Sequence, residues 1–167
     1  LRHCVYTKGC VSYETKNFNY TIVHCNADWT KSDLAEVEYL DGFSTGIIED
    51  TYQSINTTVL YTNYQLKFPN NDLQFKCSGN YAVLIYEDGK RENIKATACF
   101  SIVESNISIE ATIKGNTDKE INKRHQQVDF SIEHTTFRVQ DPFSDFKIIV
   151  RQNNRNDNQV SNIKPTY

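Results

Sequence analysis

The chain has 167 residues, of which 38% are hydrophobic and 23% charged, and its formal net charge is −3. This composition is typical of a globular protein, and the acidic balance argues against binding to nucleic acid. No apolar run reaches the length of about 18 residues that a transmembrane helix needs, so no direct membrane insertion is expected. Ten tyrosines and nine phenylalanines favour β-strands.

The first clear strand covers residues 18–25, where Phe18, Tyr20 and Ile22 alternate with more polar neighbours. It ends in the sequence HCNADW, which brings a histidine, a thiol and a carboxylate close together in the chain. On a strand, His24 and Cys25 point to opposite faces, so they cannot act together as base and nucleophile or as ligands of one metal ion.

We therefore predict structural roles for the reactive groups of this stretch, with no metal site and no catalytic residue. His24 is expected at the end of the strand, Cys25 in the core, and Asp28 with Asn26 in an Asx-type turn. Trp29 is the only tryptophan. A lone tryptophan in a polar loop is either an anchor into the core or a binding hot spot, and the sequence leaves both open.

A long loop follows, and residues 30–39 show its best helical tendency. One or two turns of helix are expected there, with Ser32 as the N-cap. The loop is rich in acidic residues, but their spacing is too irregular for a calcium-binding loop, so a solvated face is expected. The acidic residues are Asp33, Glu36, Glu38 and Asp41.

Further strands alternate in the same way over residues 64–68 and 73–77, and residues 81–86 are apolar on both faces, as a central strand would be. Gly79 lies two residues before Tyr81. This spacing resembles the tyrosine corner of immunoglobulin-like sandwiches, in which the tyrosine hydroxyl bonds back to the upstream backbone. Asp88-Gly89 is a strong hairpin signal, and it predicts a returning strand over residues 94–103.

The five cysteines leave at least one thiol unpaired within the chain, and none is expected in a CxxC site. Cys77 and Cys99 lie in strand-like segments and are predicted to be small buried hydrophobic residues.

Short strands separated by turns rich in Asn, Asp, Gly and Pro predict an all-β protein. We expect an immunoglobulin-like β-sandwich over residues 1–104. Residues 105–167 supply about three more strands, too few for a closed sandwich, and are predicted to be the truncated start of a second β-sandwich domain. The alternative is a single larger sandwich over residues 1–167.

Several segments together resemble the plug protein of the bacterial type IX secretion system. They are YTIVHCNADWTKSDLAEVEYLDGF, SINTTVLYTNYQLKFPNNDLQFKCSGNYAVLIYEDG and HQQVDFSIEHTTFRVQDPFSDFKIIVRQNNR, followed by NIKPTY. The resemblance implies a secreted protein of Bacteroidota that is built from β-sandwich domains and is longer than this chain. Plug proteins seal the periplasmic mouth of the outer-membrane translocon when no substrate is passing, and the family brings no catalytic residues.

The resemblance thus implies a non-enzymatic periplasmic protein, exported by an N-terminal signal that this chain does not contain. Its expected partner is the outer-membrane protein translocon, and neither a cofactor nor a small-molecule ligand is expected. The long loop is the predicted contact, through Trp29, Tyr39 and Phe43. The alternative function is a secreted carbohydrate-binding sandwich, which would need a flat platform of exposed aromatic rings.

Overall fold

The structure is a computed structural model that describes the backbone of residues 4–10 and, with their side chains, residues 15–104, 106–118, 124–135, 138–153, 155 and 157–164. The predicted all-β class is confirmed, because nearly every regular element is an antiparallel strand. The chain divides into two compact units, Leu1–Glu104 and Ser105–Tyr167. That these units are two separate domains stays a prediction. No helix in the described part of the chain combines the length and hydrophobicity needed to cross a membrane.

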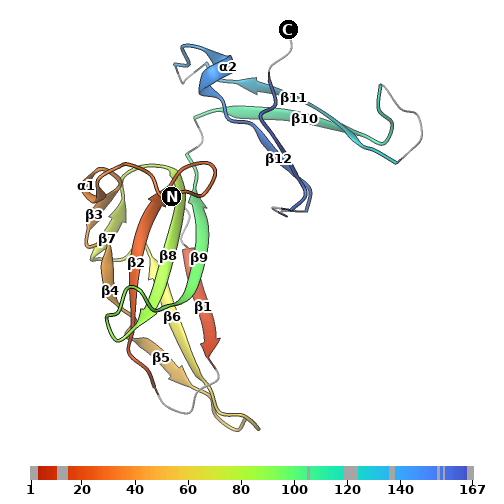
Figure 1. Cartoon of the computed structure of the whole chain (residues 1–167). Helices are drawn as coiled ribbons and strands as arrows, with labels where there is room; N and C mark the ends of the chain where they lie inside the picture. Colours follow the sequence, from red (N-terminus) through yellow and green to blue (C-terminus); the bar gives the residue numbers. More distant parts are fainter. Residues whose placement is uncertain are drawn as a thin grey trace. The chain divides into compact units, whose positions relative to one another are not determined.

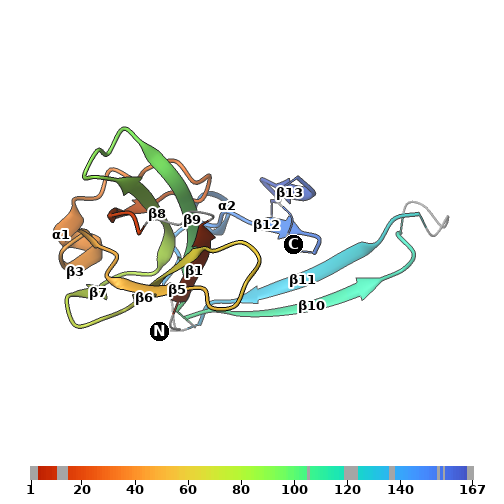
Figure 2. The same ribbon diagram turned by 90° about the horizontal axis from the view of Figure 1, so that it is seen from below.

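The first unit is a β-sandwich of two antiparallel layers (Figure 1). One layer is a four-stranded sheet in the order β4 (Thr45–Ile47), β2 (Phe18–Cys25), β8 (Gly79–Glu87) and β9 (Ile94–Ile102). The other layer holds β1 (Cys4–Cys10), β6 (Thr62–Phe68) and β5 (Asp50–Gln53), and beside them the short pair β3 (Leu40–Gly42) and β7 (Leu73–Phe75). Figure 2 views the sandwich from its end, with β8 and β9 in one layer and β6 and β7 in the other.

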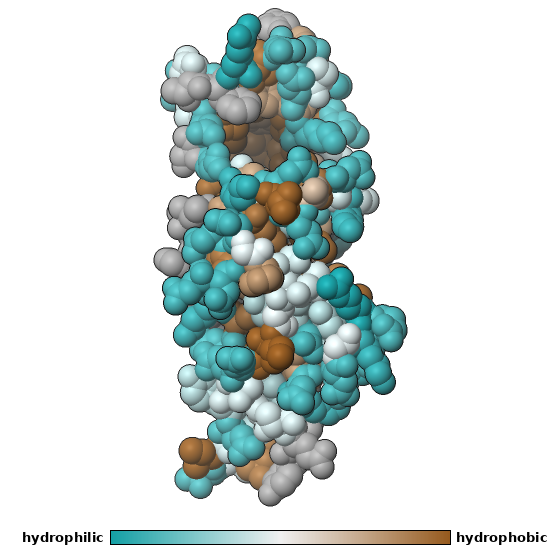
Figure 3. Space-filling model, turned by 90° about the vertical axis from the view of Figure 1, so that its left-hand side faces the viewer, coloured by the Kyte–Doolittle hydropathy of each residue, from teal (hydrophilic) through white to brown (hydrophobic). Residues whose placement is uncertain are grey.

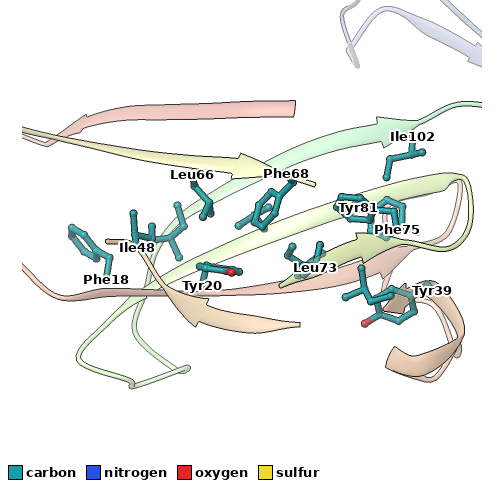
Figure 4. Close-up of a cluster of buried hydrophobic side chains, with 14 of the residues drawn as sticks. Phe18, Tyr20, Tyr39, Ile48, Leu66, Phe68, Leu73, Phe75, Tyr81 and Ile102 are labelled. Atoms are coloured by element: carbon teal, nitrogen blue, oxygen red, sulfur yellow. The ribbon is translucent and has the colours of Figure 1, made fainter. Parts of the chain in front are cut away.

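The core lies between the two layers and is rich in aromatic rings, as Figure 4 shows. The alternating apolar residues predicted to face inward do so. Successive side chains of a strand point to opposite faces, so every second residue enters the space between the layers. Removal of these large apolar surfaces from water is the main stabilising contribution to the fold. The buried core residues from β2, β6, β7 and β8 are Phe18, Tyr20, Ile22, Tyr64, Leu66, Phe68, Leu73, Phe75, Tyr81, Val83 and Ile85.

The central position of β8 explains why its sequence is apolar on both faces. It pairs with β2 on one side, from Phe18 opposite Glu87 to Cys25 opposite Asn80, and with β9 on the other. Its outward-facing residues Ala82 and Tyr86 are also buried.

The tyrosine-corner geometry is present at the start of β8. The Tyr81 hydroxyl donates a hydrogen bond to the backbone oxygen of Cys77 at 2.8 Å, and the ring is fully buried. Burial raises the pKa of Tyr81 far above its ordinary value, and the bond to Cys77 adds to this shift. Gly79 has a φ of +145°, and a Cβ there would lie 2.4 Å from Nε2 of the His24 ring, so the backbone conformation and the position of this ring both favour glycine.

Asp88 and Gly89 form the turn of the β8–β9 hairpin. Both have positive φ, at 53° and 73°, and the Lys90 amide donates to the Glu87 oxygen at 3.1 Å. Left-handed geometry at both central residues matches the right-handed twist of the strands and favours the Asp-Gly pair. A second turn, in which the Asn93 amide donates to the Lys90 oxygen, delays the start of β9 to Ile94.

The predicted helix cap and the predicted burial of Cys99 are wrong. Helix α1 (Glu36–Tyr39) is a single turn, and Ser32 does not cap it; instead the Glu38 carboxylate accepts from the Ala35 amide at 2.6 Å. Cys99 is exposed, because β9 is an edge strand and this position faces outward, whereas Cys77 is half-buried.

The second unit contains an amphipathic hairpin of β10 (Ser108–Lys114) and β11 (Gln127–Glu133). One face carries the opposed pairs Ile109–Ile132, Ala111–Phe130 and Ile113–Val128, and the other face is polar. Part of the apolar face borders a cleft of about 610 Å³ that Pro142, Phe146, Ile148 and Ile163 also line. Helix α2 (Pro142–Asp145) and the pair β12 (Ile149–Arg151) and β13 (Gln159–Ser161) complete this unit.

Candidate functional site

The HCNADW stretch ends β2 and turns sharply over residues 26–30, at the end of the sandwich where α1 lies (Figure 1). The Asn26 amide donates to the Thr30 oxygen at 2.8 Å, which closes the turn. The Asp28 carboxylate accepts from the amide of Thr30 at 3.1 Å and from its hydroxyl at 2.6 Å. The predicted Asx-type turn is therefore formed, and Asp28 serves it with its side chain.

Trp29 occupies the most constrained position of this turn. Its φ is +68°, a left-handed conformation that is uncommon for a bulky residue. Its ring is half-buried, and among the described residues its indole Nε1 is a buried donor with no hydrogen-bond acceptor. Strain and an unpaired donor both cost stability, and such costs gather at functional positions.

His24 is held by packing and by one side-chain hydrogen bond. Its Nδ1 lies 2.9 Å from the Ser32 hydroxyl, and its ring contacts the rings of Tyr39 and Tyr81 at centroid distances of 5.6 and 5.1 Å. Cys25 is 5% exposed on the opposite face, and burial raises the pKa of its thiol. A nucleophilic cysteine needs a lowered pKa, so this environment opposes thiol chemistry.

Tyr39 does not lie on the surface, and our expectation that it contacts a partner is wrong for this structure. Its ring is 2% exposed, in the core beside Tyr81. The cause is a long-range pairing: the strand β3, which starts at Leu40, pairs with β7, and the Lys76 amide donates to the Tyr39 oxygen at 3.0 Å. Burial raises the pKa of the Tyr39 hydroxyl, and the Glu36 carboxylate raises it further.

Phe43 is the most exposed aromatic side chain of the loop, at 76%. The preceding Gly42 has a φ of +105°, and a Cβ there would lie 1.9 Å from the Asp72 oxygen. Only glycine fits this approach, and the Phe43 amide then donates to the same oxygen at 3.2 Å. The backbone thus fixes Phe43 while its ring stands in solvent. On the face that Figure 3 shows, hydrophobic side chains form small separate patches among hydrophilic ones.

In the residues that the structure describes, no three His, Cys, Asp or Glu side chains come together as the ligands of a metal ion would. The predicted contacts therefore separate into a strained Trp29, a buried Tyr39 and an exposed Phe43. Their geometry suits contact with another macromolecule through single aromatic anchors.

The comparison with known families agrees with the resemblance. Residues 10–104, more than half of the chain, match the family described as Type 9 secretion system plug protein 1st domain. The chain belongs to this plug protein family. No match was found among curated proteins.

A solved structure shows the same fold for this plug-family chain. It is the crystal structure of a hypothetical protein from Parabacteroides merdae ATCC 43184 at 2.30 Å resolution, with 44% sequence identity and a TM-score of 0.89. The match covers 99% of this chain and 41% of that chain, so the plug-family chain spans less than half the length of this relative.

One exposed apolar segment of the plug-family chain was not singled out by the sequence analysis. It lies in the connection between β5 and β6, where Ile55 is 82% exposed, Val59 59% and Leu60 43%. Two flanking rings, Tyr52 and Tyr61, are 59% and 40% exposed. One feature of the sequence could have indicated this segment, since residues 51–66 contain no charged side chain.

Proposed function

We propose that the chain is a non-enzymatic periplasmic accessory protein that docks on the outer-membrane translocon of the type IX secretion system and seals its periplasmic mouth. The match of residues 10–104 to the plug protein family carries this proposal. The sandwich fold alone would not support it, since such folds host many unrelated functions.

The proposed docking contact is the loop that follows β2, through Phe43 and Trp29. Phe43 offers a large apolar ring on a backbone that is already held by its bond to Asp72, so binding would cost little backbone entropy at this position. Trp29 sits in a strained turn with an unpaired indole donor, for which a partner could supply an acceptor. Tyr39 is left out of the contact, since it packs in the core.

The absence of an enzymatic role is part of the same proposal. The reactive residues of HCNADW are engaged structurally: His24 contacts Ser32 and two tyrosine rings, Asp28 closes the turn, and Cys25 is buried on the face of β2 opposite to His24, outside the core between the layers. Cys25 and His24 lie on opposite faces of β2, so no nucleophile–base pair forms there.

The test is co-purification of the translocon, in detergent, with tagged wild-type protein and with Phe43→Asp. A charged residue at a central aromatic anchor is expected to weaken binding by roughly 30-fold or more. The matched control is Ile94→Asp, an equally drastic change at a 49% exposed position on β9. Equal recovery with Phe43→Asp would remove this ring from the interface. Failure of the wild-type protein to recover the translocon would overturn the proposed function itself.

We also propose that the second unit is the beginning of a further β domain whose remaining strands cover its apolar hairpin face. Ile109 and Ile113 on this face are 61% and 67% exposed, which is costly for a sheet that remains open to water. The longer relative, of which this chain covers 41%, supports the proposal. In the longer protein, Ile113→Asp should lower the melting temperature, and an unchanged value would show that the face stays free.

The carbohydrate-binding alternative has weaker support. Most described tyrosine rings are buried in the sandwich, and Tyr52 and Tyr61 are the exposed ones among them. Both lie beside the aliphatic segment at the end of the β5–β6 hairpin, which suggests a different kind of contact.

A further inference from the structure

The connection between β5 and β6 is the most apolar exposed segment of the first unit. We call residues 54–61 the β5–β6 tip. Figure 1 shows it at the end of the sandwich opposite to α1, beyond the paired part of the hairpin. Its exposed apolar side chains are Ile55, Val59 and Leu60, with the polar Asn56, Thr57 and Thr58 exposed between them. Two exposed rings flank them: Tyr61 directly before β6, and Tyr52 on β5. A gathering of this kind on a protruding loop marks a contact with a protein or with a membrane.

The charge distribution selects between these two surfaces. Residues 51–66, which comprise the tip and most of β5 and β6, carry no charged side chain in a chain that is 23% charged. Along the sequence the nearest charges are Asp50, the first residue of β5, and Lys67, near the end of β6, and on the neighbouring strand β1 Lys8 is paired with Tyr64. A neutral aliphatic tip with tyrosines just behind it has the order found at membrane interfaces, where aliphatic groups reach the acyl region and tyrosines remain at the headgroups. The interior of an outer-membrane barrel is polar and offers such a tip a poor site.

Four hydrogen bonds pair polar groups of the tip with one another. The Ser54 amide donates to the Tyr61 oxygen at 2.8 Å, and the Tyr61 amide donates to the Ser54 hydroxyl at 2.9 Å. The Thr57 hydroxyl oxygen lies 3.0 Å from that of Ser54 and 2.9 Å from the Val59 backbone oxygen. Backbone groups without partners would oppose transfer out of water, and these bonds lower that cost.

We propose that the β5–β6 tip is a peripheral membrane contact that inserts Ile55, Val59 and Leu60 into the headgroup–acyl boundary of a phospholipid leaflet. The contact is non-electrostatic, because the tip carries no charge and the chain as a whole is acidic. It is shallow, unlike a membrane-spanning segment, and it revises our expectation of no direct insertion. It rests on the proposed function in one respect, since that function brings the chain to a membrane.

Such a contact would add to docking on the translocon. One side of the molecule would hold the translocon through Phe43 while the tip anchors in the adjacent leaflet. Two weak contacts on one rigid sandwich raise the residence time of the whole more than either does alone. With both contacts in place, a weak contact with the translocon would be enough to hold the chain over the opening. Loss of either contact would let the chain dissociate.

The experiment is flotation of the whole protein with vesicles of phosphatidylethanolamine and phosphatidylglycerol in a ratio of three to one, and with vesicles of phosphatidylcholine alone. The wild-type protein should float with both at millimolar lipid, to the same extent at low and high salt. The double variant Ile55→Asp/Leu60→Asp should float at least about tenfold less. Val37→Asp, a change at a 73% exposed position of α1, is the matched control and should float like the wild type.

The same variants are compared in translocon co-purification in detergent, where no bilayer is present. The tip variant is expected to recover the translocon as well as the wild type does. If the wild type fails to float, or the tip variant floats equally, the membrane contact is refuted while the proposed function stands. If the tip variant loses the translocon in detergent, the tip touches protein and the lipid assignment is wrong. Circular dichroism confirms that each variant is folded.

Discussion

Replacement of Tyr81 by phenylalanine isolates the hydrogen bond of the tyrosine corner from the packing of its ring. The ring remains in the core, and only the hydroxyl that donates to the Cys77 oxygen at 2.8 Å is removed. A net hydrogen bond contributes roughly 1 kcal/mol, and an acceptor left buried without a donor costs roughly 1–3 kcal/mol. Cys77 is half-buried, so water reaches part of its surroundings and the total falls near the lower end, at about 1.5 kcal/mol.

For a cooperative unit of about 100 residues, this loss corresponds to a fall in melting temperature of roughly 6–9 °C. Urea unfolding followed by circular dichroism should show the lower free energy with an unchanged slope. The matched control is Tyr86→Phe, whose hydroxyl lies 3.2 Å from the hydroxyl of Thr21. This distance is long for a bond between two hydroxyl groups, so its loss should cost less, about 0.5 kcal/mol. The reasoning is refuted if Tyr81→Phe unfolds like the wild type, or if Tyr86→Phe is equally destabilised.

Two more predictions concern the strained turn and the buried titratable groups. In urea unfolding, the Trp29→Gly variant should be more stable than the Trp29→Ala variant by about 1 kcal/mol. Alanine keeps a Cβ at a φ of +68°, where it is strained, and glycine has none. Equal stability of the two variants would mean that the turn relaxes and that Trp29 is not strained. Burial raises the pKa values of Cys25, Tyr20, Tyr39 and Tyr81 in the folded state, so the folded protein keeps protons that the unfolded chain releases. The stability that these four groups contribute should therefore be constant below about pH 8, and the stability of the protein should decrease as the pH rises past about 9–10. A stability that increases above about pH 9 would contradict the assignment.

The strands and the core were predictable from the sequence because their information is local. Alternation at Phe18, Tyr20 and Ile22 sets which face is apolar, and only one face of β2 can meet the other layer. The spacing of Gly79 and Tyr81 was enough to predict the tyrosine corner, because the Tyr81 hydroxyl binds a backbone oxygen only four residues upstream.

Several of the predictions that failed concern residues whose surroundings are set by segments distant in the sequence. Tyr39 lies in a polar loop, and only the pairing of β3 with β7 carries it into the core. Ser32 looked like a helix cap, but the histidine that binds its hydroxyl stands on β2. Cys99 was misjudged although the alternation of β9 is regular: it shares the outward face with Lys95, Thr97 and Ser101, and the usual burial of free cysteines was given more weight than this pattern. The β5–β6 tip went unnoticed because uncharged apolar residues suggest burial, and its exposure depends on where the hairpin ends.

The proposed function is closure of the translocon by the chain, and a conductance measurement tests closure directly. Purified translocon in a planar bilayer is expected to show a large, stable conductance that falls when the wild-type protein is added to the periplasmic side. Phe43→Asp should require a roughly 30-fold higher concentration for the same effect. A conductance that stays unchanged at saturating wild-type protein would contradict the account.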